Sequence, residues 1–190
     1  MRTSLFVILA AVATLAGCTE RQPADLVLRG GTIYDGTGDP GYEGDVVIQG
    51  DSIVLVGDAS AWRGATEVDV TGLAVAPGFI NMLSWGTESL LHDGRGLSDV
   101  LQGVTLEVFG EGTSMGPINE TMRAEMLAEQ GDIRFDIPWT TLGEYLEHMV
   151  AKGVSVNVAS FVGATTVRIH ELGYANRAPT PDELARMQEL

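Results

Sequence analysis

The segment Gly103–Glu111 carries the side chains best suited to chemistry. Glu107 and Glu111 are two carboxylates four positions apart in a run that otherwise alternates apolar residues with others. This period of two predicts a strand with Val104, Leu106 and Val108 on a helix-covered face and both carboxylates on the opposite, inward face. Glu111 ends the strand, which suits a metal ligand or an acid/base group, or else a solvated loop carboxylate.

Glu107 is expected deeper in the fold, where an unpaired carboxylate is costly and a hydrogen-bonded structural role is favoured. Two further runs, Gly78–Ser84 and Val154–Val162, predict neighbouring strands. Alternation places Asn81 and Asn157 inward on them. The sequence therefore predicts an inward polar layer made by Asn81, Glu107 and Asn157.

The other metal-binding residue types are sparse. The three histidines, His92, His148 and His170, fall in a polar loop, off the apolar stripe of a helix, and after a strand. We do not expect them to bind metal. A single cysteine excludes a disulfide framework and a multi-cysteine zinc site.

That cysteine, Cys18, directly follows Leu15-Ala16-Gly17 and the apolar run Leu5–Ala13. The run is too short to span a bilayer and is typical of a signal peptide. We predict a lipoprotein signal peptide over 1–17, lipidation of Cys18 and a polar tether over 18–24. Together they predict a bacterial envelope protein, anchored to the outer membrane and facing the periplasm. The alternative is a free buried cysteine.

Composition limits the partners. The chain has 190 residues, with 11 Lys and Arg against 26 Asp and Glu, and a net charge of −15. Nucleic acid is excluded because phosphate neutralisation needs a basic patch.

Two kinds of pattern divide the chain. Residues 25–76 show short apolar runs separated by Gly and Asp turn residues, which predict a small antiparallel β domain. Residues 77–190 alternate strand and helix patterns, which predict a parallel α/β array. Thr141 and Thr180 each stand three positions before a Glu, a capping-box pattern that begins two helices.

Three segments then carry a family resemblance: Ala76-Pro77-Gly78-Phe79-Ile80, Gly103-Val104-Thr105 and Asn157–Gly163. They resemble the amidohydrolase superfamily, and within it the N-acyl-D-amino-acid deacylases, or D-aminoacylases. The resemblance implies an α/β fold: the amino-terminal part of a (β/α)8 TIM-type barrel, preceded by a small β-sandwich segment and truncated after about three barrel strands. It also implies a metal-dependent hydrolase of non-peptide C–N bonds, with one divalent metal, zinc, in a full-length parent and weak or no binding in this fragment.

The chain departs from that family at the metal-binding positions. The family carries Asp-x-His-x-His where this sequence has Asn81, Leu83 and Trp85, and a zinc-binding cysteine where it has Gly112. Glu111 is then the one metal-ligand candidate, and no catalytic residue can be assigned. Two functions follow: a fragment of a hydrolase of N-acyl-D-amino acids or similar small amides, inactive alone, or a catalytically degenerate barrel lipoprotein that binds a ligand or partner.

Overall fold

The computed structural model describes residues 20–190, which divide into two compact units, one that ends at Pro77 and one that begins at Gly78. The predicted signal peptide, Cys18 and its neighbour Thr19 lie outside the described residues. Within residues 20–190, no helix has the length and apolar character needed to cross a membrane.

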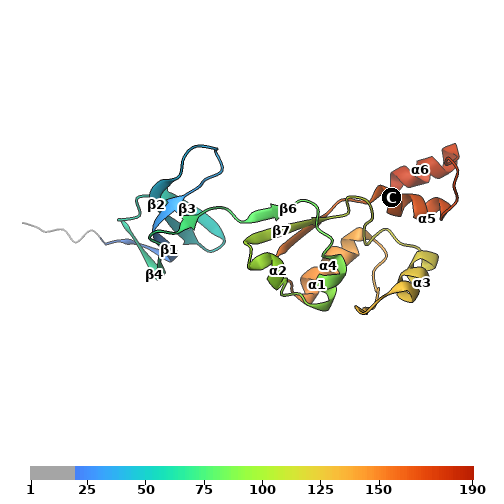
Figure 1. Ribbon diagram of the computed structural model, residues 1–190, viewed down its shortest axis with the longest axis horizontal. Coiled ribbons are helices and arrows are strands. Elements are labelled where there is room, and N and C mark those ends of the chain that lie inside the picture. The colour runs from blue at the N-terminus through green and yellow to red at the C-terminus, as the bar shows by residue number, and fades with distance from the viewer. Residues whose placement is uncertain (1–19) are drawn as a thin grey trace, which may run out of the picture. The chain divides into compact units, whose positions relative to one another are not determined.

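The first unit is a five-stranded mixed sheet (Figure 1). Its strands are β1 (Gln22–Ile33), β2 (Tyr42–Gln49), β3 (Ser52–Gly57), β4 (Trp62–Asp69) and β5 (Ala74–Val75). They lie in the order β3-β2-β1-β4, with β5 also paired to β1. The β2 strand is antiparallel to β1 and β3, but β4 and β5 run parallel to β1. The prediction of an all-antiparallel unit is therefore wrong for β4 and β5, since local turn signals do not determine which strands pair.

The β1 strand also corrects a predicted boundary. Gly30 and Gly31 predict a turn between two strands, yet the strand continues through them with a shift of register between Leu28 and Gly31. Gly30 has φ +71°, a left-handed conformation that glycine adopts at no steric cost. The glycine pair therefore forms a β-bulge inside one strand.

The second unit confirms the predicted parallel α/β array. Its strands are β6 (Phe79–Asn81), β7 (Val104–Phe109) and β8 (Asn157–Ser160), parallel and in that order. Its helices are α1 (Thr87–His92), α2 (Leu97–Val100), α3 (Glu120–Glu129), α4 (Leu142–Lys152), α5 (Ala164–Leu172) and α6 (Pro181–Glu189).

The two helices predicted from capping boxes begin where expected. The Thr141 and Thr180 side chains accept hydrogen bonds from the backbone N–H groups of Glu144 and Glu183. In return, the carboxylates of these two glutamates accept from the backbone N–H groups of the two threonines. The α3 helix was not predicted individually. Its start is marked by Asn119, whose side chain accepts from the Met122 backbone N–H at 3.0 Å.

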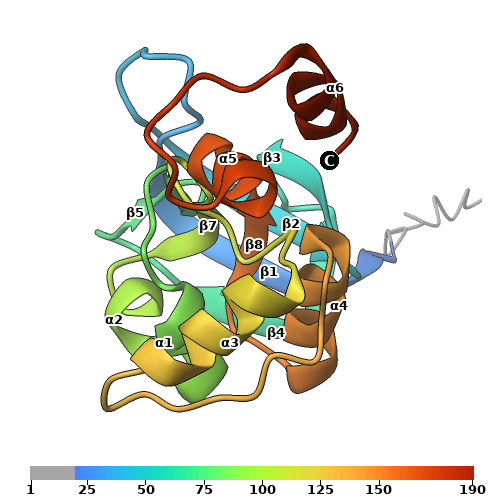
Figure 2. The same cartoon turned by 90° about the vertical axis from the view of Figure 1, so that its right-hand side faces the viewer.

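The core of this unit lies on one face of the parallel sheet. Phe109 of β7 and Val156 before β8 pack with buried residues of α1, α3 and α4, including Tyr145 and Met149. Figure 2 shows α1, α3 and α4 gathered on one side of this unit. Trp139 lies in the same core, where its indole N–H donates to the Met115 carbonyl at 2.7 Å. This packing holds the ends of β6 and β7 in place.

Candidate functional site

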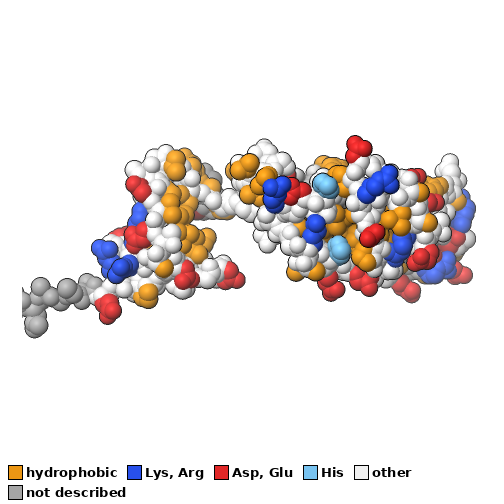
Figure 3. Space-filling model, turned by 90° about the horizontal axis from the view of Figure 1, so that it is seen from below, with side chains coloured by type: hydrophobic (Ala, Val, Ile, Leu, Met, Phe, Trp, Pro, Cys, Tyr) orange, Lys and Arg blue, Asp and Glu red, His pale blue; other side chains and the backbone are white. Residues whose placement is uncertain are grey.

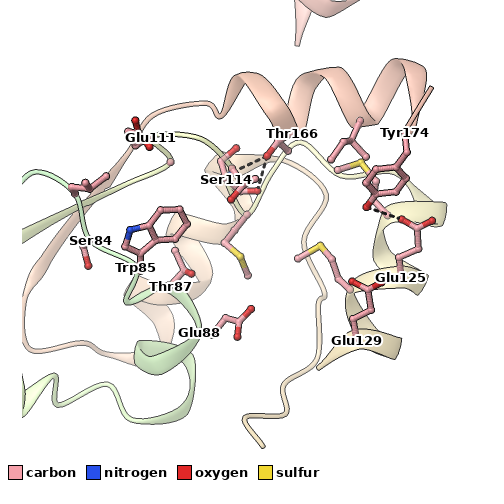
Figure 4. Close-up of a pocket in the computed structure, with 17 residues that line it drawn as sticks. Ser84, Trp85, Thr87, Glu88, Glu111, Ser114, Glu125, Glu129, Thr166 and Tyr174 are labelled. Carbon is pink, nitrogen blue, oxygen red and sulfur yellow. Dashed lines mark hydrogen bonds between the residues drawn. The ribbon is translucent and has the colours of Figure 1, made fainter. Parts of the chain in front are cut away.

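A cavity of about 460 Å³ opens beyond the carboxyl ends of β6 and β7 (Figure 4). One wall is the segment Leu83–Glu88, another is the segment that follows β7, and the far wall combines α3, α5 and Tyr174. Parallel α/β folds place their ligand sites at the carboxyl ends of strands, where loops and helix starts converge. This cavity is therefore the candidate site.

Glu111 lies at this cavity, exposed, two residues beyond the end of β7. The preceding Gly110 has φ +83°, and a Cβ there would overlap the backbone carbonyl of Phe161. The turn that presents Glu111 therefore depends on glycine. Its role as a metal ligand or acid/base group stays a prediction.

Glu107 lies on the face opposite to the one predicted. It is buried, at 2% exposure, and shares its face of β7 with Phe109, which belongs to the helix-packed core. Its pairing partner on β8 is Val158, which also packs against that core. The inward assignment fails because a parallel sheet in this fold is apolar on both faces, so alternation alone does not distinguish them.

The predicted polar layer is consequently divided between two faces. Asn81 pairs with Glu107, and both line a second hollow beside α1 and α2. Asn157 is exposed and pairs with Leu106, and its amide donates to the Thr105 carbonyl at 2.9 Å. The structure therefore brings Asn81 and Glu107 together without Asn157.

Glu107 has a local hydrogen-bonding role. Its Oε2 accepts from the Ser84 hydroxyl at 2.5 Å, and the Ser84 oxygen accepts from the Gly86 backbone N–H at 3.1 Å. A Cβ on Gly86 would lie 2.6 Å from Glu107 Oε2, so the backbone must approach closely here. These contacts fix the Ser84–Gly86 segment, which carries Trp85 to the cavity.

A second set of buried hydrogen bonds fixes the opposite wall. The Ser114 backbone N–H donates to the Thr166 hydroxyl at 2.7 Å, and the Thr166 hydroxyl donates to the Ser114 carbonyl at 3.2 Å. The Ser114 hydroxyl accepts from the Gly163 N–H at 2.9 Å and donates to the Gly116 carbonyl at 2.5 Å. The segment after β7 is thereby tied to the start of α5.

The far wall contains residues that the sequence interpretation missed. The α3 helix contributes Met122, Glu125, Met126 and Glu129, and Tyr174 follows α5. Glu125 and Glu129, like Met122 and Met126, are four positions apart and so share a helix face. In the sequence, the Asn119 N-cap and this four-residue spacing together were the signals that could have predicted the α3 helix and its cavity-facing side.

The carboxylates make the site electronegative. The charge of Glu125 raises the pKa of the Tyr174 phenol above its ordinary value, and burial and the charge of Glu129 add smaller contributions. The Tyr174 Oη atom lies 3.5 Å from the Glu125 carboxylate. In the core nearby, burial raises the pKa of Tyr145 above its ordinary range, with smaller contributions from Glu107 and Glu88. Negative charge disfavours ionisation of both phenols.

None of the three histidines lines the cavity. His92 is exposed at the end of α1, and His170 on α5 lies 3.2 Å from the Glu171 carboxylate. His148, placed by the sequence off the apolar stripe of its helix, is half-buried, with its ring centroid 5.2 Å from that of Trp139.

The chain is similar to characterised bacterial deacylases. It is 37% identical to D-aminoacylase and 33% identical to N-acyl-D-aspartate deacylase, both of Alcaligenes xylosoxydans xylosoxydans, over 90% and 88% of this chain. A crystal structure of D-aminoacylase superposes with a TM-score of 0.75 over 88% of this chain. The chain is homologous to the D-aminoacylase-like amidohydrolases over nine-tenths of its length. No family model matches it.

These amidohydrolase relatives are much longer than the chain, which spans 36% of the D-aminoacylase and 34% of the N-acyl-D-aspartate deacylase. A further relative of known structure, N-acyl-D-glutamate deacylase from Bordetella bronchiseptica, was solved with zinc and a phosphonate mimic of the tetrahedral intermediate. It is 26% identical, with a TM-score of 0.74 over 88% of this chain and 35% of its own.

Residues 20–190 do not by themselves bring together ligands for zinc, the metal that the N-acyl-D-glutamate deacylase structure contains. At the ends of β6 and β7, Leu83, Trp85 and Gly112 have no ligand atom in their side chains. Within residues 20–190, no three His, Cys, Asp or Glu side chains lie close enough together to hold a metal ion. Glu111 alone is one donor, and one carboxylate does not make a site.

Proposed function

We propose that this chain forms the substrate-binding part of a hydrolase of linear amide bonds in small N-acyl compounds such as N-acyl-D-amino acids. The similarity to D-aminoacylase over nine-tenths of the chain carries the proposal. It is supported by the cavity at the carboxyl ends of β6 and β7, where catalytic barrels place their substrates.

The described residues supply binding and positioning in this proposal. Trp85, Met122 and Met126 offer apolar contact to an acyl chain or side chain, and the Ser84–Glu107 and Ser114–Thr166 hydrogen bonds hold the walls in place. Preorganised walls lower the entropy lost when a substrate is bound. Water activation needs groups that residues 20–190 do not bring together, so no chemical step is assigned to them.

A second function is favoured by the same missing ligands. With Leu83, Trp85 and Gly112 at the metal-binding positions, a barrel that binds a ligand without hydrolysing it is consistent with the site.

A location in the bacterial envelope, through a lipid on Cys18, is also proposed, and the Leu15-Ala16-Gly17-Cys18 motif supports it.

The test compares hydrolysis with metal content in the full-length hydrolase to which we propose that this chain belongs. We expect that protein to release free amino acid from N-acetyl-D-amino acids in preference to their L-enantiomers. No hydrolysis of any acylated amino acid, with or without added zinc, would favour the ligand-binding function. A loss of bound metal in Glu111→Gln, with the fold intact by circular dichroism, would make Glu111 a ligand.

A further inference from the structure

Glu107 is the most deeply buried carboxylate of residues 20–190, and it has no cationic partner among them. It is 2% exposed, and no Lys, Arg or His of this part of the chain forms an ion pair with it. Since the described residues themselves cover this side chain almost completely, segments beyond them can add little to its contacts.

Other carboxylates with little exposure are paired with arginine. The side chains of Asp45, Glu171 and Glu183 are 19%, 12% and 15% exposed, and each lies within 3.3 Å of a guanidinium group. An interior carboxylate without such a partner is costly, and an apolar side chain of similar size fills the same space at a lower cost. The stability of the fold therefore does not explain a glutamate at position 107.

Within residues 20–190, the one hydrogen bond of the Glu107 side chain leads to the wall of the cavity. Its Oε2 accepts from the Ser84 hydroxyl at 2.5 Å, and the Ser84 backbone N–H donates to the Val108 carbonyl at 3.0 Å. Because a carboxylate only accepts, it fixes the direction of the hydroxyl proton and leaves the Ser84 oxygen to accept from the Gly86 N–H. Ser84 is thus tied to β7 by its main chain and its side chain.

Glu107 is the side chain that joins the turn between β6 and α1 to the sheet. A Cβ on Gly86 would lie 2.6 Å from Glu107 Oε2, so the main chain of the turn lies directly against the carboxylate. Trp85 stands between Ser84 and Gly86, and its indole extends toward the cavity that it lines (Figure 4). Loss of the carboxylate therefore allows Trp85 to move relative to β7.

We propose that Glu107 is a positioning residue of the hydrolase: acting through Ser84, its buried carboxylate holds Trp85 where the substrate binds. This role rests on the proposed function, in which Trp85 contacts the substrate. The glutamate at position 107 then serves binding at the expense of stability, as is common where a functional site breaks a local rule of folding.

The test replaces Glu107 in the full-length hydrolase and measures stability, the surroundings of Trp85 and catalysis separately. Urea unfolding reports stability. Fluorine NMR of protein labelled with fluorotryptophan reports the surroundings of Trp85, whose signal is assigned by its loss in Trp85→Phe.

In Glu107→Leu we expect an unfolding midpoint no lower than that of the unsubstituted protein, together with a shifted or broadened Trp85 signal. The value of kcat/KM should fall about tenfold, mainly through a higher KM. Glu107→Gln, whose amide oxygen can still accept from Ser84, should keep the Trp85 signal and leave kcat/KM within about twofold of the unsubstituted value.

Asp45→Ala is the matched control, because the Asp45 carboxylate also holds part of the main chain, accepting from the Gly30 and Ala59 N–H groups in the first unit. It should lower the unfolding midpoint and leave the Trp85 signal and kcat/KM unchanged. Ser84→Ala removes the same bond as Glu107→Leu and should shift the Trp85 signal even if Glu107→Leu does not fold. An unchanged Trp85 signal in Ser84→Ala or Glu107→Leu, or a lower unfolding midpoint in a folded Glu107→Leu, would overturn the proposal.

Hydrolysis and the position of Trp85 can fail separately. A full-length protein that cleaves no acylated amino acid would refute the hydrolase, and the Trp85 signal would still decide whether Glu107 holds this wall of the cavity. Cleavage with the same kcat/KM and the same Trp85 signal in Glu107→Leu would refute the role of Glu107 and leave the hydrolase standing.

Discussion

At the scale of single residues, glycines determine how closely the segments around the cavity approach. A Cβ on Gly163 would lie 2.7 Å from the Gly112 carbonyl, the Ser114 nitrogen and the Thr113 Cα, all of which resist displacement. A Cβ on Gly112 would meet nothing within 4 Å. Gly163 and Gly112 therefore lie close together, but only Gly163 lacks room for a side chain.

Gly163→Ala is therefore expected to destabilise the protein by about 1–3 kcal/mol, the usual cost of overpacking. Gly112→Ala should change the free energy of unfolding by less than about 0.5 kcal/mol. Urea unfolding measures both. Equal stability of the two variants would show that the segment after β7 does not lie against the start of α5.

The departures from the family also belong to this scale. The resemblance implies imidazoles where this chain has Leu83 and Trp85, and a cysteine where it has Gly112. No group of side chains elsewhere in the described residues replaces these three as a metal site.

At the scale of elements, the α6 helix depends on one glutamate. Glu183 accepts from the Arg177 guanidinium at 2.6 and 2.7 Å and from the Thr180 backbone N–H at 2.7 Å. The Arg177 hydrogen bonds, and then those from Thr180, hold the pKa of Glu183 well below its ordinary value.

A carboxylate with a lowered folded-state pKa contributes stability that is present above its unfolded pKa, about 4.3, and is lost as the pH falls toward the folded value. We expect amide exchange in residues 181–189 to remain slow down to pH values below 4.3. Arg177→Gln should raise the pKa of Glu183, so that the helix loses protection at a higher pH. NMR titration of the Glu183 carboxyl measures the change in pKa. An unchanged titration in Arg177→Gln would mean that the ion pair does not form.

At the scale of the whole molecule, the face of the parallel sheet opposite the helices is apolar and exposed. Ile80 and Phe161, at 56% and 54% exposure, lie on or beside this sheet, and Leu83 is 53% exposed. Figure 3 views this unit from the side of its helices, where hydrophobic side chains also reach the surface among carboxylates and cations. Exposed apolar surface of this kind favours association.

Residues 78–190 produced alone are therefore expected to bind a hydrophobic dye and to self-associate in sedimentation experiments. Ile80→Thr combined with Phe161→Gln should reduce both. Val150→Thr is the control, because Val150 is 76% exposed but lies on the outer side of α4. A monomeric fragment that binds no dye would contradict this prediction.

The sequence alone determined the elements whose signals are local. The Thr141 and Thr180 caps, the three apolar runs that became β6, β7 and β8, and the family segments at 76–80 and 103–105 were all sufficient because each depends on neighbouring residues. The absence of imidazole and thiolate at the metal-binding positions was equally readable from residue types.

Only the tertiary structure decided which residues meet. It placed Glu107 on the helix-covered face, because both faces of a parallel sheet are apolar and the register irregularity between Phe79 and Ile80 breaks the inference from one strand to the next. The tertiary structure also pairs β4 with β1 in parallel, an arrangement that the turn residues in the sequence cannot specify. It also joined Trp85, Glu88, Glu125 and Tyr174 in one cavity, since their spacing in the sequence carries no information on distances between elements.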